Sequence, residues 1–91
     1  MKSLGSAIEE LVQRLGIGKK VREYEAVLQW ERIVGEKIAS ISTAVRIQQG
    51  ILMVKVKTAP WRNELSLLKP DIIRKMNEEL KEEVVKDIRF Q

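Results

Sequence analysis

The sequence predicts one small α+β domain, a two-layer sandwich in which helices cover one face of a three-stranded sheet. Two observations carry this prediction. Apolar residues recur every three or four positions in residues 4–39 and again in 60–80, as they do in helices. In residues 45–57 and 84–90 they alternate with polar residues, as they do in strands. The predicted order is helix, helix, strand, strand, long helix, strand, and we expect residues 1–91 to form a single domain.

The first helix is expected to begin at Ser6, because Ser6 and Glu9 have the spacing of a capping box. Gly16 and Gly18 should end it, since glycine tolerates the left-handed backbone that closes many helices. The apolar residues of this segment are Leu4, just before the cap, and then Ile8, Leu11 and Leu15.

A second helix is predicted to begin near Lys19 or Lys20. Trp30 has apolar neighbours on both sides and is interpreted as a core residue. Gly35 either ends this helix or lets another backbone pack closely against it. The apolar positions of this helix are Val21, Tyr24, Val27, Leu28, Trp30 and Val34.

The strands are predicted from alternation. Residues 45–48 and 51–57 flank Gln49-Gly50 and should form a hairpin, and residues 84–90 should form the third strand. Between them, Thr58 is a plausible N-cap with Pro60 in the first helical turn.

The long helix carries a stripe that stays in phase through Pro70, so we predict one helix with a bend near residues 66–70 rather than two helices. The stripe consists of Trp61, Leu65, Leu68, Ile72, Met76 and Leu80. The residues expected to be largely buried in the whole domain are Leu11, Val34, Val54, Val56, Leu65, Ile72 and Ile88.

The composition argues against an enzyme. The chain has no cysteine and no histidine, which removes the commonest nucleophile, general base and metal ligands. Its adjacent glutamates diverge around their helices and are interpreted as solvated surface. We therefore expect no cofactor, no metal and no small-molecule substrate. With no signal-peptide pattern and no long apolar run, the expected location is the cytoplasm, without membrane contact.

Positive charge is concentrated in one short segment. The formal net charge is +4, and residues 36–58 carry four bases against one acid. If the apolar side of the sheet faces the helices, Arg46, Lys55, Lys57 and Arg89 point outward together, which favours phosphate. The competing interpretation is a solvated face whose lysines prevent edge aggregation. No aromatic residue is expected on this face to stack on bases, so any binding should be weak and tolerant of sequence.

Four strings, taken in order, resemble the DciA family of bacterial proteins: residues 30–39, 50–56, 59–65 and 85–90. The resemblance implies a KH-like fold and an accessory role with the replicative helicase and DNA in replication initiation. Many members carry an extension, and since this chain stops at Gln91 any function of such a tail is expected to be absent. A nucleic-acid-binding KH domain also uses a Gly-x-x-Gly loop. The corresponding residues here, 68–71, contain no glycine, so RNA clamping there is not expected.

Trp61 and Arg62 are the candidate contacts for the helicase. A first-turn tryptophan next to an arginine has the chemistry of an interface anchor. Trp61 also begins the apolar stripe of its helix, so a core role competes with this interpretation. Two other functions stay open, a KH-like RNA-binding module and a pure protein-interaction domain.

Overall fold

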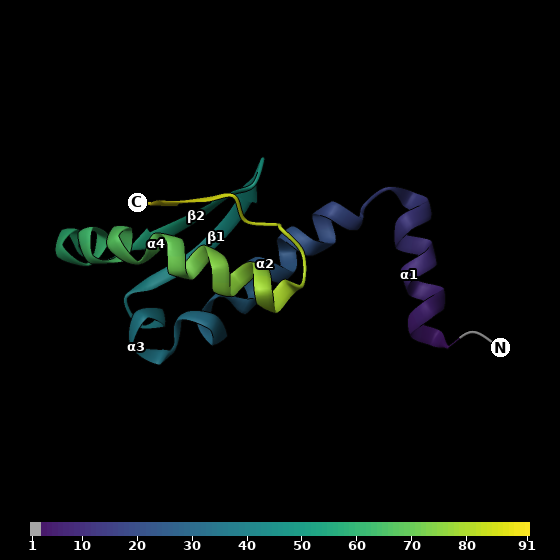
Figure 1. Ribbon diagram of the computed structural model, residues 1–91, viewed down its shortest axis with the longest axis horizontal. Coiled ribbons are helices and arrows are strands. Elements are labelled where there is room, and N and C mark those ends of the chain that lie inside the picture. Colours follow the sequence, from purple (N-terminus) through teal and green to yellow (C-terminus); the bar gives the residue numbers. More distant parts are fainter. Residues whose placement is uncertain (1–2) are drawn as a thin grey trace.

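The computed structural model describes residues 3–91, apart from the side chain of Val12. The elements follow the predicted order, with one short helix added after Gly35 (Figure 1). They are α1 (Leu4–Leu15), α2 (Gly18–Val34), α3 (Glu36–Ala39), β1 (Ser42–Gln48), β2 (Ile51–Val56), α4 (Ala59–Leu80) and β3 (Asp87–Phe90). Gly35, at φ 90°, separates α2 from α3, as expected of a residue that ends a helix in a backbone region favoured by glycine.

The sheet is mixed. Strand β1 pairs antiparallel with β2, and β2 pairs parallel with β3, in the order β1-β2-β3. Its inner face is apolar, with Leu52, Val54 and Val56 from β2 and Ile88 from β3 all buried. Helices α2 and α4 pack against each other and against this face. The two-layer α+β prediction is confirmed.

Most of the expected core is buried. Val54, Val56, Leu65, Ile72 and Ile88 are all within it, and Val34 is half-buried against it. Trp30, interpreted as a core residue, is 3% exposed, and its Nε1 donates to Ser42 Oγ at 3.0 Å. The buried indole N–H therefore has the partner that its burial demands.

The prediction for Leu11 was wrong, because this side chain is 51% exposed. Helix α1 does not cover the sheet; it projects from the body beyond the start of α2 (Figure 1). Its cap also differs from the prediction. Ser3 Oγ accepts from the backbone N–H of Ser6 at 3.1 Å, so Ser6 lies inside the helix and does not cap it with Glu9. The helix ends before Gly16, as predicted, at a φ of 71°.

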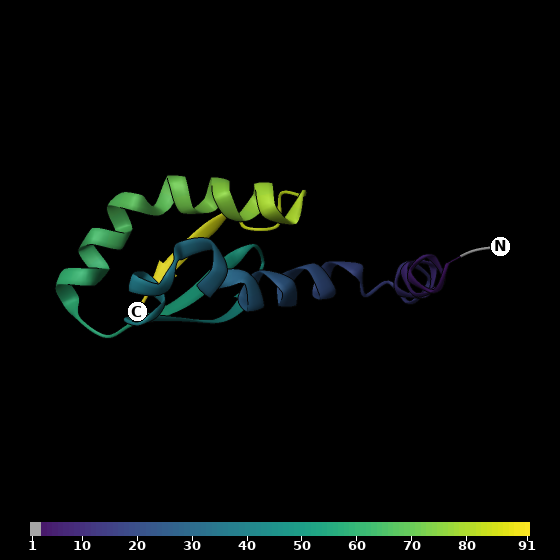
Figure 2. The ribbon, with the colours of Figure 1, turned by 90° about the horizontal axis from the view of Figure 1, so that it is seen from below.

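Helix α4 is continuous through Pro70, as the phase of its stripe predicted. It begins at the Thr58 cap with proline in its first turn. Figure 2 shows it bending partway along its length. Pro70 has no N–H for the carbonyl of Ser66, four residues earlier, which relaxes the helix at this point. The bend lets both halves follow the core, where Leu65 and Ile72 are buried.

The third strand is shorter than predicted, because residues 84–86 form a loop and only Asp87–Phe90 is strand. The side chain of Asn77 holds this loop. Its Oδ1 accepts from the N–H groups of Val84 and Val85 at 3.1 and 2.9 Å, and its Nδ2 donates to the Val85 carbonyl at 2.8 Å. Val85 is thus buried without belonging to the sheet.

Candidate nucleic-acid interface

The outer face of the sheet brings three of the four predicted cations together. Arg46 of β1 and Arg89 of β3 are both register partners of Met53 in β2, so the three residues form one row across the sheet. Lys55, two residues further along β2 on the same face, is paired with Thr43. The outer face therefore has a central methionine with arginines on either side and a lysine in the next row.

A β-bulge sets the phase of β1. The register shifts between Ala44 and Arg46, so that Ala44 and Ile47 both pair with buried residues of β2. The extra residue is Val45, which is 42% exposed and does not share the inner face with Ile47 as the simple alternation predicted. The bulge still leaves Arg46 on the outer face.

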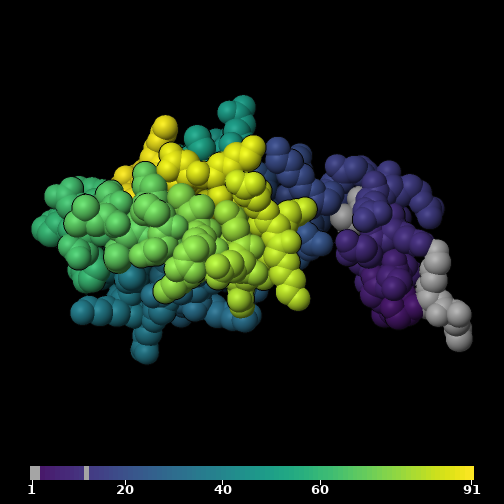
Figure 3. Space-filling model, in the orientation of Figure 1, coloured from purple at the N-terminus to yellow at the C-terminus, as the bar shows by residue number. Residues whose placement is uncertain are grey.

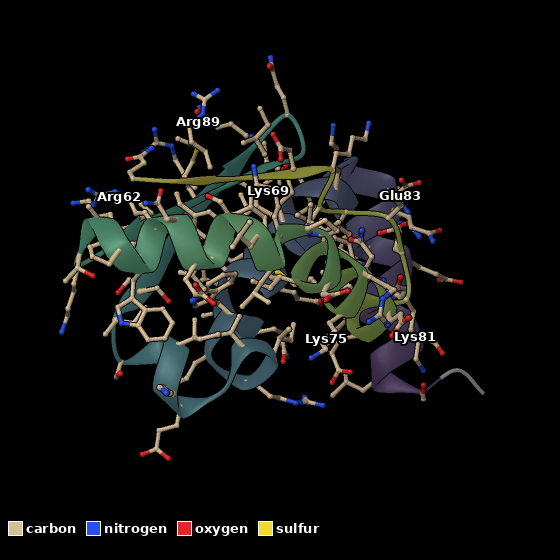
Figure 4. The ribbon with its side chains drawn as sticks, turned by 60° about the vertical axis from the view of Figure 1, so that its left-hand side comes forward. Arg62, Lys69, Lys75, Lys81, Glu83 and Arg89 are labelled. Carbon is tan, nitrogen blue, oxygen red and sulfur yellow. The ribbon has the colours of Figure 1, made fainter. Side chains whose placement is uncertain are left out.

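All four predicted cations are exposed, and no ion pair joins any of them to a carboxylate within the described part of the chain. Arg46 Nε donates to Gln48 Oε1 at 3.4 Å. Arg89 extends from the side of β3 that faces away from α4 (Figure 4). Lys57 lies just beyond β2, where its backbone N–H donates to the Ile41 carbonyl at 2.9 Å. These side chains are free to meet an anion from solution.

One carboxylate, Asp87, begins β3 on the outward-facing side. The backbone N–H of Ile88 chiefly, and the charges of Lys69 and Arg89 as well, lower the pKa of Asp87 below its ordinary value, with burial opposing them. Lys69 Nζ lies 3.3 Å from Asp87 Oδ1. Lys69 of α4 therefore balances part of the charge of this carboxylate, and Arg89 of the outer face also interacts with it.

Trp61 and Arg62 lie at the start of α4. Trp61 is half-buried against the core, and Lys37 Nζ lies 5.9 Å from the centroid of its ring, within reach of a cation–π contact. Arg62 is also half-buried, and its Nη1 donates to the carbonyl of Val56 at 3.4 Å. Trp61 therefore packs partly against the core and leaves part of its side chain exposed.

Lys37 is the residue near these sites that sequence reasoning missed. In the sequence, Lys37 stands out only as one of the four bases in residues 36–58. Its contact with Trp61 joins α3 to α4, and no local pattern in the sequence signals such a long-range pair.

Two features are absent from the described residues, a metal-binding cluster and a membrane-spanning helix. Residues 3–91 contain no group of three or more acidic, histidine or cysteine side chains arranged to hold a metal ion. Within the same residues, no helix has both the length and the apolar character needed to cross a bilayer.

Comparison with known proteins identifies the family. The family model described as "Dna[CI] antecedent, DciA" matches residues 3–90. The chain belongs to the DciA family. The resemblance carried by the four strings is thereby confirmed, and no enzymatic family is indicated.

The DciA relatives are bacterial. The UPF0232 protein of Mycobacterium tuberculosis strain H37Rv is 26% identical over 87 residues, which cover 96% of this chain and 46% of that protein. The UPF0232 protein of Corynebacterium glutamicum strain R is 26% identical over 89 residues, covering 98% and 50%. That of Rhodococcus jostii strain RHA1 is 27% identical over 86 residues, covering 94% and 46%. This chain spans about half the length of the relatives it matches.

Proposed function

We propose that this DciA-family chain is a non-catalytic accessory factor of bacterial DNA replication, which binds the replicative helicase and touches DNA in the cytoplasm. The observation that carries the DNA part is the row of Arg46 and Arg89 around Met53, with Lys55 beside it. The helicase part is supported by the family, whose role is compatible with helicase loading.

The outer sheet face favours contact with the phosphate backbone. Its cations are exposed and unpaired within the described residues, and each phosphate they neutralise releases counterions. Among the described residues no aromatic side chain projects from this face, since Phe90 pairs with the inward-facing Val54. Base stacking is absent from this mode of binding, which makes it weak and tolerant of sequence.

The test replaces Lys55 and Lys57 together by glutamate and measures binding to single-stranded and duplex oligonucleotides by fluorescence anisotropy. Wild-type affinity should fall with salt along a log–log slope of about −2 to −4, as expected for roughly three or four phosphates. The double variant should lose binding while its circular dichroism stays unchanged.

A matched control carries the same change of charge elsewhere. Lys75 of α4 and Lys81, which follows that helix, are exposed and extend on the side away from Arg89 (Figure 4). Replacing both by glutamate should weaken binding only slightly, through the net charge. Equal losses in the two double variants would move the DNA contact away from the sheet.

The helicase contact is proposed at Trp61 and Arg62. A half-buried tryptophan offers rigid apolar area at low cost in conformational entropy. Trp61→Ala should weaken binding to the replicative helicase by about 2 kcal/mol, a typical value for an interface anchor. Isothermal titration of helicase against both proteins measures this, with circular dichroism to verify folding.

Leu67→Ala is the control, because Leu67 lies on the same helix and is 77% exposed. It should bind as wild type does. Equal affinities of wild type and Trp61→Ala would remove Trp61 from the interface. A wild-type chain that does not bind helicase at all would overturn the functional assignment.

RNA clamping in the manner of a KH domain is the less favoured alternative. Residues 68–71, where the Gly-x-x-Gly loop would lie, are part of the continuous helix α4. A preference for RNA over DNA in the same titrations would support the RNA-binding alternative. Failure to bind either nucleic acid at low salt would favour a pure protein-interaction domain.

A further inference from the structure

Helix α1 exposes an apolar stripe whose four side chains the described residues leave more than half exposed. The exposed fractions are 79% for Leu4, 54% for Ile8, 51% for Leu11 and 61% for Leu15. Figure 3 shows this helix as a separate lobe, joined to the body at one end. A contiguous apolar surface of this kind on a small soluble domain marks an interaction site.

Helix α2 exposes a second stripe, on the side away from the sheet. Its inward side buries Ala26 and Trp30, whereas Tyr24 is 65% exposed and Leu28 is 63% exposed. Ile17, just before the helix, is 40% exposed, and Val21 between them is half-buried. These four residues have the spacing of one helical face.

The two stripes match each other about Gly16. The residues of α1 lie one, five, eight and twelve positions before Gly16, and those of α2 lie at the same four distances after it. When two helices pack antiparallel, residues equally distant from the reversal point face each other. The facing pairs are Leu15 with Ile17, Leu11 with Val21, Ile8 with Tyr24 and Leu4 with Leu28. The four-three-four spacing on both sides is also that of interlocking helix seams.

Within the described residues of one chain, the two stripes do not cover each other. Ile8 and Val21 line an open groove of about 780 Å³ between α1 and the body. The connection is Gly16-Ile17, at the short end of the two to five residues that join antiparallel helices, and it leaves α1 pointing away from the body (Figure 1). Glu9 pairs with Arg22 at 3.6 Å in this open arrangement.

We propose that the occupant of each stripe is a second copy of this chain. Helix α1 of one protomer packs antiparallel on the exposed face of α2 of its partner, and the partner's α1 does the same in return. A two-fold exchange of this kind buries both stripes of both copies while the connection stays open. This interface involves only the chain's own surfaces, so dimerisation does not depend on helicase binding.

The first experiment measures oligomeric state by sedimentation over a range of protein concentrations. Wild type should dimerise with a dissociation constant between about 1 μM and 1 mM. Leu11→Glu should raise that constant at least tenfold, whereas Leu67→Glu, at a leucine 77% exposed on α4, should leave it unchanged. A wild-type chain that stays monomeric at about 1 mM, or two variants with equal effects, would overturn the proposal.

The second experiment separates exchange from closure within one chain. Because the sequence has no cysteine, Ile8→Cys and Tyr24→Cys can be made as two single variants, mixed and oxidised with glutathione disulfide. A cross-linked species containing one copy of each variant supports exchange, since a disulfide needs Cα atoms within about 7 Å. A mixture of Leu67→Cys with Tyr24→Cys is the control and should not cross-link.

The double variant carrying both cysteines in one chain completes the test. Exchange predicts a covalent dimer. A monomer with an internal disulfide as the main product would show that α1 closes on its own α2, and would overturn the proposal. Absence of any specific cross-link above the control would do the same, and would assign the stripes to a different partner.

Discussion

Helices α1 and α4 both carry an apolar stripe, but the stripe of α4 packs into the core and that of α1 is exposed. Leu65 of α4 is fully buried, whereas Leu11 of α1 is 51% exposed. Helix α4 is attached to the body by its core stripe, by the Asn77 hydrogen bonds and by the Lys69–Asp87 pair. Helix α1 is joined to the body at its C-terminal end, and the Glu9–Arg22 ion pair spans the groove between α1 and α2. Periodicity thus predicts that a helix forms, but its apolar face does not reveal which surface will cover it.

Truncating one leucine on each helix gives the largest contrast. Leu65→Ala should cost about 3–4 kcal/mol of unfolding free energy, because it leaves a cavity in the core. Leu11→Ala should cost less than about 0.5 kcal/mol in the monomer. Urea denaturation at a protein concentration of about 0.1 μM, below the proposed dimerisation range, measures both. Comparable losses would mean that α1 packs on the body in solution.

Much of this fold follows from the sequence because its elements are locally encoded. The Thr58 cap, the stripe through Pro70 and the alternation in residues 51–57 specify α4 and β2 by contacts near in the chain. The placement of α1 is not local. The sequence predicts a capping box at Ser6 and Glu9, but Ser3 supplies the same kind of cap one turn earlier.

In the candidate site, too, some features follow from local sequence patterns and others from long-range packing. Alternation placed Arg46, Lys55 and Arg89 on the outer face, and the strand register sets two of them around Met53. The bulge at Val45 and the contact of Lys37 with Trp61 depend on packing between segments distant in the chain. Such long-range relations leave no periodic signal in one sequence.

The Asn77 side chain is the second attachment of α4 that can be removed. Asn77→Ala deletes three hydrogen bonds and leaves the N–H groups of Val84 and Val85 without their partner. We expect a loss of about 2 kcal/mol, since unsatisfied donors that are partly buried cost more than a single bond contributes. Asn63→Ala, at an exposed asparagine of the same helix, should change stability by less than about 0.5 kcal/mol. Equal effects, measured by thermal and urea denaturation, would contradict this role.

The ends of the two helices differ in one residue type. Helix α1 is followed by Gly16 at φ 71°, whereas α4 is followed by Lys81 at φ 57°. A side chain in this left-handed region is strained, and glycine is not. Lys81→Gly should therefore raise the unfolding free energy by about 0.5–1 kcal/mol. Lys81→Ala keeps the Cβ atom and should bring no gain, so a gain in both variants would point to charge rather than backbone strain.

The smallest expected effect concerns the ion pair between Lys69 of α4 and Asp87 of β3. The backbone N–H of Ile88 and the side chain of Lys69 lower the pKa of Asp87 below its ordinary value of 3.8. A lowered pKa means that the folded state favours the ionised carboxylate, so its contribution to stability is present above pH 3.8 and is lost as the pH falls through the folded value.

Asp87→Asn should accordingly lower the unfolding free energy at pH 7, and the gap from wild type should close on acidification below that range. The gap should be modest, because the carboxylate side chain is 55% exposed. Urea denaturation at several pH values measures it, with Glu64→Gln, an exposed carboxylate on α4, as the control. A gap that stays constant from neutral to acidic pH would show that the charge of Asp87 does not help to attach α4, which would then depend on other contacts such as its apolar stripe and the Asn77 hydrogen bonds.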